Sequence, residues 1–275
     1  MGPTQKEKAE RFRALHEREG AFLLPNPWDG GSARMLERLG FEALATSSGA
    51  CAATLGRRDG KVTRDEALEH CRQIVAATDL PVAADLENGF ASEPAAVAET
   101  IRLAAAAGLA GGSIEDFSGD ASRGQFDIGR ATERIAAAAE SARALPFHFM
   151  LAARAENFVR GNPSMEDTIK RLVVYEQAGA DVLFAPGLPD LAAVRAVCAA
   201  VRKPVNFMVG LKGKSFTVAE LKAAGVRRVS FASSLYRAAL TGLLAATQEI
   251  KDTGTFGYLD GTMTTAEMNA YLREG

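Results

Sequence analysis

One local pattern of hydrophobic and polar positions recurs along the chain. A run with helical periodicity ends at small residues and a glycine, and a short apolar run follows directly. The pattern occurs at residues 38–46, 107–115, 177–184 and 223–231. Glycine is the usual left-handed stop after a helix, and an apolar run without strict alternation indicates a strand buried on both faces. The pattern therefore predicts helices alternating with strands of a parallel sheet.

Four further apolar runs complete the set of predicted strands. Residues 80–85 and 203–208 carry a proline at the start of the run, where no ladder hydrogen bond is lost. Residues 21–24 and 147–154 are the other two runs. Together the runs predict eight strands, near residues 22, 43, 82, 112, 149, 182, 205 and 229.

Helical patterns separate these strands, and strict alternation favours a (β/α)8 barrel. The predicted helices are residues 32–39, 64–77, 93–107, 128–144, 164–178, 190–201, 217–224 and 235–250. A doubly wound open sheet is the alternative, but no Gly-x-Gly-x-x-Gly motif follows a strand. We predict one domain over residues 1–275, with an N-terminal helical arm at 1–20. A Gly-rich hinge and a C-terminal helix at Thr264–Arg273 occupy residues 252–275.

Composition and charge narrow the class of protein. Hydrophobic residues make up 47% and charged residues 24%, the ordinary balance of a soluble globular protein. The net charge of −2 provides no basic surface for nucleic acid or for an anionic membrane. No apolar run approaches the ~18 residues of a membrane span, and the charged start lacks the apolar core of a signal peptide. The 3 cysteines are widely spaced, which predicts a reducing, cytoplasmic compartment.

Acidic residues follow two neighbouring predicted strands, at the end of a barrel where catalytic residues lie. Asp85 and Glu87 come after the third strand, and Glu115 and Asp116 after the fourth. Carboxylates this close repel one another unless a cation lies among them. Oxygen ligands without histidine or cysteine favour Mg²⁺ or Mn²⁺. The alternative is that these side chains cap helices or pair with arginines at the barrel rim.

Other strand ends carry candidates for substrate binding. Arg154 ends the fifth strand, where its guanidinium could hold a substrate carboxylate or pair with Glu115 or Glu156. The turn that begins at Ser47 could hold an anion through its backbone N–H groups. The remaining polar candidates at strand ends are Trp28, Asp29, Ser48, Gly49 and Asn206.

Nucleophiles and bases of other kinds are less suited to catalysis. His16, His70 and His148 lie in helical patterns or at the opposite end of a strand, so structural roles are expected. Cys51 follows the serine turn and is a weak candidate. The predicted strand cores contain no lysine, and Lys212 and Lys214 lie in a loop, which disfavours a Schiff-base mechanism.

Four motifs, taken together, resemble the isocitrate lyase/phosphoenolpyruvate mutase superfamily. They are residues 47–59 (SSGACAATLGRRD), 85–89 (DLENG), 113–116 (SIED) and 153–156 (ARAE), within a resemblance that runs from Ala21 to Leu244. The resemblance implies a (β/α)8 barrel, Mg²⁺ (Mn²⁺ as the alternative) and a 2-oxo or 2-hydroxy acid substrate. It also implies a homo-oligomer, most simply a tetramer built from helix-swapped dimers.

The resemblance assigns roles to single residues. Asp85 is expected to bind the metal, with Glu87 and Glu115 holding it through water. Asp59, Arg154 and Ser47 are expected to be catalytic. Substrate contacts are expected from Ser47, Ser48, Gly49, Asp85, Arg154 and Asn206. We add Trp28 and Asp29 as further substrate-binding candidates, because they follow the first predicted strand.

The chain departs from both well-defined branches of that superfamily. The lyases carry a Lys-x-Cys-Gly-His loop after the fourth strand, whereas residues 117–126 contain neither Cys nor Lys. The mutase loop is missing as well, and Pro186 replaces the mutase histidine. We therefore predict a Mg²⁺-dependent carbon–carbon lyase that acts through a metal-stabilised enolate on small 2-oxo or 2-hydroxy di- or tricarboxylates. Its reaction would be oxaloacetate decarboxylation or methylisocitrate/isocitrate lyase-like cleavage. The alternatives are P–C bond chemistry on phosphonopyruvate and a 2-oxo acid binding protein.

Overall fold

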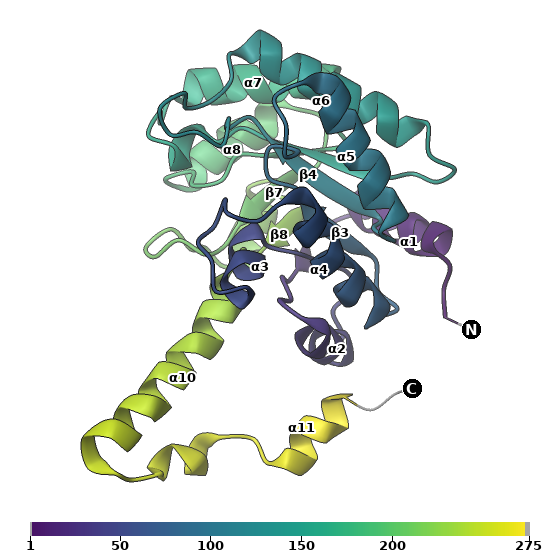
Figure 1. Ribbon diagram of the computed structural model, residues 1–275. Helices are drawn as coiled ribbons and strands as arrows, with labels where there is room; N and C mark the ends of the chain where they lie inside the picture. The colour runs from purple at the N-terminus through teal and green to yellow at the C-terminus, as the bar shows by residue number, and fades with distance from the viewer. Residues whose placement is uncertain (1, 273–275) are drawn as a thin grey trace.

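Eight parallel strands form a nearly closed barrel in the computed structural model, which describes residues 2–272 (Figure 1). The strands are β1 Phe22–Leu24, β2 Leu44–Ala45, β3 Val82–Asp85, β4 Gly111–Glu115, β5 Met150–Arg154, β6 Val182–Phe184, β7 Val205–Met208 and β8 Arg228–Ser230. Their order around the sheet is β1-β8-β7-β6-β5-β4-β3-β2. Next to the open seam the Ala45 N–H donates to the Pro25 carbonyl at 3.0 Å. The (β/α)8 prediction is confirmed.

The helices between the strands begin and end close to their predicted bounds. They are α2 Gly30–Arg38, α4 Arg64–Ala76, α5 Pro94–Ala106, α6 Ile128–Arg143, α7 Met165–Gln177, α8 Leu191–Ala200, α9 Val218–Ala223 and α10 Ser234–Thr253. Side chains fix several starts: Thr63 and Thr217 each form a capping box with a glutamate in the first turn. Among residues 2–272 no helix has the length and apolarity needed to cross a lipid bilayer.

Three short helical segments differ from the prediction. The serine turn continues into α3 Ser48–Thr54, with the Ser47 hydroxyl accepting from the Ala50 N–H at 3.4 Å. Two 3₁₀ helices, η1 Asn157–Val159 and η2 Gly257–Gly261, were also not predicted. All three are short and lack a helical spacing of large apolar residues, so the sequence pattern does not show them.

The apolar core has two layers. The outer layer lies between the strands and the surrounding helices. The inner layer fills the lower barrel and includes one face of α1 Gln5–Glu17, where Phe12 and Leu15 pack with Phe22, Met150 and Val182. Helix α1 therefore closes the end of the barrel at which the strands begin. Gly111 is required there, because an added Cβ would lie 2.6 Å from the Met150 carbonyl oxygen.

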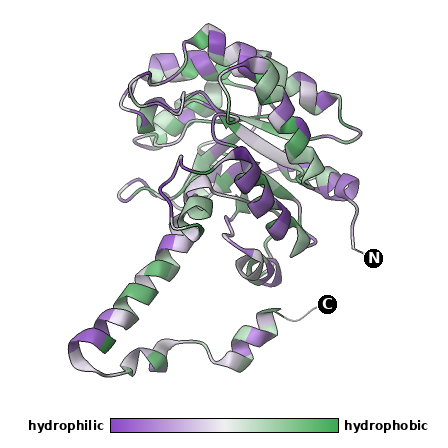
Figure 2. Cartoon of the chain, in the orientation of Figure 1, coloured by the Kyte–Doolittle hydropathy of each residue, from purple (hydrophilic) through white to green (hydrophobic). Residues whose placement is uncertain are grey.

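The C-terminal segment leaves the barrel. Helix α10 runs outward and the chain returns through η2 to α11 Thr265–Leu272, beneath α2 (Figure 1). There Arg34 donates to the Leu272 carbonyl at 3.2 Å. Figure 2 colours parts of this segment as hydrophobic. Its large exposed hydrophobic residues are Leu243, Leu244, Ile250, Phe256, Leu259, Met263 and Met268. The end of the predicted helix, Arg273, lies outside the described residues.

Candidate active site

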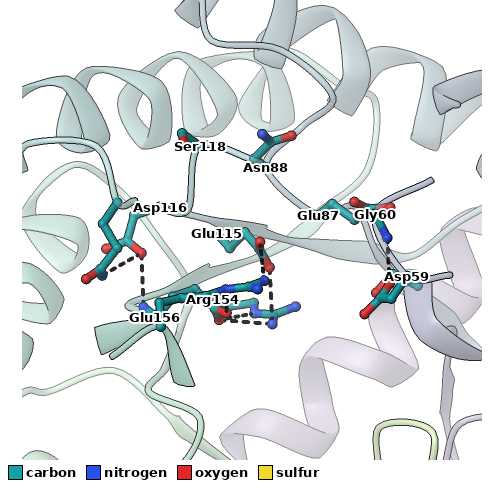
Figure 3. Close-up of polar contacts among 12 residues, drawn as sticks. Asp59, Gly60, Glu87, Asn88, Glu115, Asp116, Ser118, Arg154 and Glu156 are labelled. Atoms are coloured by element: carbon teal, nitrogen blue, oxygen red, sulfur yellow. Dashed lines mark hydrogen bonds and ion pairs between the residues drawn. The ribbon is translucent and has the colours of Figure 1, made fainter. Parts of the chain in front are cut away.

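Arg154 lies at the centre of a charged cluster at the carboxyl ends of β3, β4 and β5. Its Nη1 lies 2.8 Å from Oδ1 of Asp85, and its Nη2 lies 3.2 Å from Glu115 and 2.9 Å from Glu156 (Figure 3). The sheet register explains the meeting, because Arg154 pairs with Glu115 across β4 and β5. Burial opposes the charged form of Arg154, but Glu156, Asp85 and Glu115 outweigh it and raise its pKa. The arginine is therefore permanently charged and held from three sides.

A second arginine, Arg160, follows η1 and contacts the same acids. It lies 3.3 Å from Glu115 and 3.4 Å from Glu156, and its guanidinium stacks on the Phe117 ring at 3.8 Å. Burial raises the pKa of Glu115, and the charge of Arg154 opposes that rise. We did not predict Arg160 from the sequence. The sequence feature that could have identified Arg160 is its spacing of four positions from Glu156, because this spacing brings two side chains to one side of a helical turn.

Glu87 contrasts with Asp85, Glu115 and Glu156, each of which contacts an arginine. Its backbone is left-handed, with φ of 48°, and its N–H donates to Oδ1 of Asp85 at 3.2 Å. Within residues 2–272 its carboxylate accepts no hydrogen bond and forms no ion pair. Burial, followed by Asp85 and Asp59, raises the pKa of Glu87 to about 7. A cation near Glu87 and Asp85 would relieve this repulsion.

The donor atoms fit a hard divalent cation that keeps much of its water. Only carboxylate oxygens are available at Asp85, Glu87 and Glu115, the set that the sequence predicts. In the described part of the chain no three His, Cys, Asp or Glu side chains converge closely enough to hold a metal together. Mg²⁺ typically uses one or two carboxylates and takes its other ligands from water and substrate. The magnesium site stays a prediction, and the ion pairs of Asp85 and Glu115 with Arg154 fit the alternative in which these carboxylates pair with arginines at the barrel rim.

A cavity of about 170 Å³ opens beside this cluster, inside the barrel mouth. Ser47, Ser48, Gly49, Asp85 and Arg154 line it, so the structure brings these predicted site residues together. The Ser48 N–H donates to Oδ2 of Asp85 at 3.2 Å, which joins the serine turn to the charged cluster.

A wider cleft of about 940 Å³ adjoins the cavity and leads to solvent. Asp59 lines both spaces, whereas Glu87 and Glu115 line the cleft. The loop over residues 117–126 borders the cleft through Phe117 and Ser118. An isolated antiparallel bridge between Phe117 and Gln125 gives that loop its shape.

Three of the acidic and aromatic candidates lie elsewhere. Asp29 caps α2, accepting from the Ser32 N–H at 2.7 Å, and the Trp28 carbonyl lies 2.8 Å from the His70 ring. Neither residue lines the cavity. Asp116 points away from Glu115 (Figure 3). It accepts from Arg171 at 3.0 Å and from the Tyr175 hydroxyl at 2.7 Å. Asp116 therefore fixes α7 against the barrel, which is the structural alternative for a carboxylate at this position.

Comparison with known proteins adds to this geometry. The family model for phosphoenolpyruvate phosphomutase matches residues 12–251, which is most of the chain and includes every strand. The chain belongs to this family. The superfamily resemblance seen in the sequence motifs is thereby confirmed.

Relatives of this phosphomutase-family chain include lyases. The 2-methylisocitrate lyase of Halalkalibacterium halodurans is 30% identical over 92% of this chain and 85% of its own length. A structure from Burkholderia cenocepacia J2315, described only as a lyase/mutase, is 50% identical with a TM-score of 0.96, covering 97% of this chain and 96% of its own. Oxaloacetate acetylhydrolase in complex with oxalate is 26% identical with a TM-score of 0.88, covering 99% and 95% of the two chains.

Cys51 offers a test of whether this family member uses a thiol. It is buried on α3 among Ala52, Val62 and Ala67, and burial, followed by the charge of Glu87, raises its pKa to about 11. A general acid contributes at least ~100-fold to a rate, so Cys51→Ser should lower kcat by less than about tenfold. Steady-state kinetics of the purified variant measures this. Complete loss of activity in a folded Cys51→Ser protein would contradict the expectation.

Proposed function

We propose that this protein is a Mg²⁺-dependent carbon–carbon lyase that acts on small 2-oxo or 2-hydroxy dicarboxylic acids. The observation that carries the proposal is the meeting of Arg154, Asp85 and the Ser47 turn around one small cavity. The names of the relatives, 2-methylisocitrate lyase and oxaloacetate acetylhydrolase, support cleavage of a carbon–carbon bond in a small acid.

The residues of the chain divide the chemical work. Arg154 would hold the substrate carboxylate with its planar fork of donors, and the backbone of the Ser47 turn would donate to the oxo oxygen. As the carbon–carbon bond breaks, negative charge gathers on that oxygen, and donors fixed in place stabilise it. Bound Mg²⁺ would supply further positive charge there. Asp59, which lines the cavity from the exposed loop, would accept the proton of a 2-hydroxy group.

The loop over residues 117–126 gives this site no evident proton donor. The Ser118 hydroxyl donates to the Asp120 carbonyl at 3.0 Å, and hydrogen bonds from Ser122 lower the pKa of Asp120. A serine is too weak an acid, and an ionised aspartate has no proton to give. Decarboxylation or slow retro-aldol cleavage can instead take the proton from water.

We therefore expect isocitrate to be cleaved far more slowly than the ordinary enzyme scale of about 10 s⁻¹. Turnover of oxaloacetate and other small 2-oxo acids should be less impaired, because these reactions depend less on a loop acid. Coupled assays for glyoxylate and pyruvate, run side by side with Mg²⁺, give the comparison. An isocitrate kcat near 10 s⁻¹ would show that another group donates the proton.

The same substrate panel separates the proposed activity from its alternatives. Phosphonopyruvate belongs in the panel, because the family model carries the phosphomutase name and P–C bond chemistry is the second candidate. Release of pyruvate or glyoxylate from carbon acids supports the lyase. Turnover of phosphonopyruvate alone supports the second candidate. Tight binding of 2-oxo acids without turnover of any panel member would identify a binding protein and overturn the proposal.

We also propose that the C-terminal segment packs against a second copy of the chain, giving a homo-oligomer that is a tetramer of swapped dimers. The segment exposes large apolar side chains, Leu243 and Leu244 among them, at 58% and 68% of their surface. Exposing so many large apolar side chains to water is unfavourable, and exposed apolar surfaces of this kind mark sites of protein association. We propose a cytoplasmic location as well, on the wide spacing of the 3 cysteines in the sequence.

Truncation after Lys251 tests that assembly. The shortened protein should sediment as a smaller species, because the apolar residues of η2 and α11 would be gone. Analytical ultracentrifugation at micromolar concentration compares it with the full chain. His148→Ala is the control substitution, at the barrel floor, which is the end at which the strands begin. It should leave the sedimentation coefficient unchanged. A monomeric full-length chain would refute the proposal.

A further inference from the structure

Arg228 is a buried cation inside the barrel for which the structure shows no acidic partner. It is the first residue of β8, and its side chain points to the barrel interior together with Ser230, whereas Val229 packs in the outer layer. Only 5% of Arg228 is exposed. Among residues 2–272 no carboxylate lies within ion-pair distance of its guanidinium.

One hydrogen bond fixes the direction of this guanidinium. Arg228 Nε donates to Oδ1 of Asn206 at 2.8 Å, and Nδ2 of Asn206 donates to the Ser230 hydroxyl at 3.0 Å. The side-chain amide of Asn206 is thereby fixed at both ends. In the described chain the two terminal nitrogens of Arg228 donate to no protein acceptor. These two nitrogens are not among the fully buried polar atoms without a partner, and Arg228 lines the same cavity as Arg154, so they are accessible from that cavity.

The surroundings of Arg228 do not compensate its charge. Burial, followed by the positive charge of Arg154, lowers the pKa of Arg228 to about 9, so Arg228 remains charged at neutral pH. His16 on the barrel floor is neutral, because burial and then the charge of Arg228 lower its pKa to about 3. A buried charge without a partner destabilises a fold. An anion that enters the cavity would provide the missing partner.

The space between the two arginines suits a short, compact ligand. Ala45, Ala83 and Ser113 are among the residues that line the cavity. These small side chains leave room for a carbon chain but provide no charge. The cavity is about 170 Å³, the scale of a small organic acid, and it opens into the wider cleft.

We propose that Arg228, held by Asn206, is a specificity-determining residue that binds a second anionic group of the substrate, in the cavity that it lines together with Arg154. The substrate is then a compact acid with two anionic groups. The assignment of its first carboxylate to Arg154 rests on the proposed function, whereas the role of Arg228 does not depend on the reaction. A monocarboxylate would leave Arg228 unpaired, and sites that lose such a contact reject the ligand strongly.

Binding of unreactive acids tests this role without turnover. Butyrate and succinate have the same carbon chain and differ in the second carboxylate, and 3-phosphonopropanoate replaces that carboxylate with a phosphonate. Isothermal titration calorimetry with Mg²⁺ present should show succinate or 3-phosphonopropanoate binding at least about tenfold more tightly than butyrate. Whichever of the two binds better identifies the second group as a carboxylate or a phosphonate.

The variants are Arg228→Met and, as a second form, Arg228→Gln. Either should weaken binding of the dianion at least about tenfold while changing butyrate affinity less than about threefold. Arg227→Met is the matched control, because Arg227 is the adjacent residue and lies outside the barrel, 3.5 Å from the Arg18 and Gly20 carbonyls. It should change neither affinity. The unliganded Arg228→Met protein should melt at the same or a higher temperature, since an unpaired buried charge is removed.

Two outcomes would overturn the proposal. Equal affinity of the wild-type protein for butyrate and both dianions would show that no second anion site exists. Equal weakening of all three ligands in Arg228→Met or Arg228→Gln would show that Arg228 only supports the cavity wall. Failure of every carbon acid to turn over, with the dianion preference intact, would instead refute the proposed lyase reaction and leave this site standing.

Discussion

Replacing Asp85 with alanine should lower kcat/KM by about 1,000-fold or more. Asp85 is the carboxylate on which the site converges: Arg154 contacts one oxygen, and the Ser48 N–H donates to the other. Its loss would remove the proposed direct ligand of the metal and would free Arg154 from one of its partners. Steady-state kinetics with saturating Mg²⁺ measures the change, on the best substrate of the panel.

Metal removal is the companion measurement. EDTA should abolish activity in the wild-type protein, and added Mg²⁺ or Mn²⁺ should restore it. His148→Ala is the control variant, because His148 lies at the barrel floor, 3.4 Å from Asp181. It should change kcat/KM by less than about threefold, as expected for a surface-accessible group outside the site. Full activity in thoroughly metal-stripped protein would show that the carboxylates serve another purpose.

Replacing Arg154 with methionine should affect both activity and stability. Methionine has a similar length but no charge, so Glu115 and Glu156 would lose the more buried of the two arginines that they share while staying buried themselves. Breaking a buried pair by removing one partner costs about 3–5 kcal/mol of unfolding free energy. Activity should fall with it, because the substrate carboxylate would lose its planar donor. Urea unfolding and kinetics on the same preparation give both values.

Arg160→Met separates the effect of position from that of charge. Arg160 contacts the same two acids, but its side chain is 36% exposed, so water replaces much of what it provides. We expect a loss of no more than about 1 kcal/mol. If Arg154→Met and Arg160→Met were equally destabilising, the central position of Arg154 would not matter.

The barrel could be predicted from the sequence because its strands are buried on both sides. Each strand is a short apolar run, and most of the helices before them end at a glycine, as at Gly179 and Gly225, where φ is 105° and 98°. Helix α3 could not be predicted, since it is made of small residues with no apolar stripe. Its existence depends on the Ser47 cap and on packing around Cys51 and Ala52.

The sequence predicted those residues of the candidate site that lie directly at the ends of strands. Asp85, Glu115 and Arg154 end neighbouring strands, so parallel pairing alone brings them together. Asp29 also follows a strand, but its hydrogen bonds serve the start of α2. Arg228 was missed because we interpreted β8 by its apolar residues. In this barrel the polar side chains of β8, Arg228 and Ser230, point inward. A hydrophobic pattern assigns polar side chains to the solvent-exposed face of a strand.

The packing of α1 under the strands has a consequence for the order of events in a catalytic cycle. Phe12 and Leu15 fill the end of the barrel at which the strands begin, so that end provides no passage. In the described part of the chain, the cleft at the mouth, bordered by the loop over residues 117–126, is therefore the route that we expect ligands to take. When a cleavage yields two fragments, the one nearer the mouth must depart first. The fragment held deeper in the barrel leaves last. The next substrate binds the same empty form of the enzyme that this fragment can rebind, so the two compete for it.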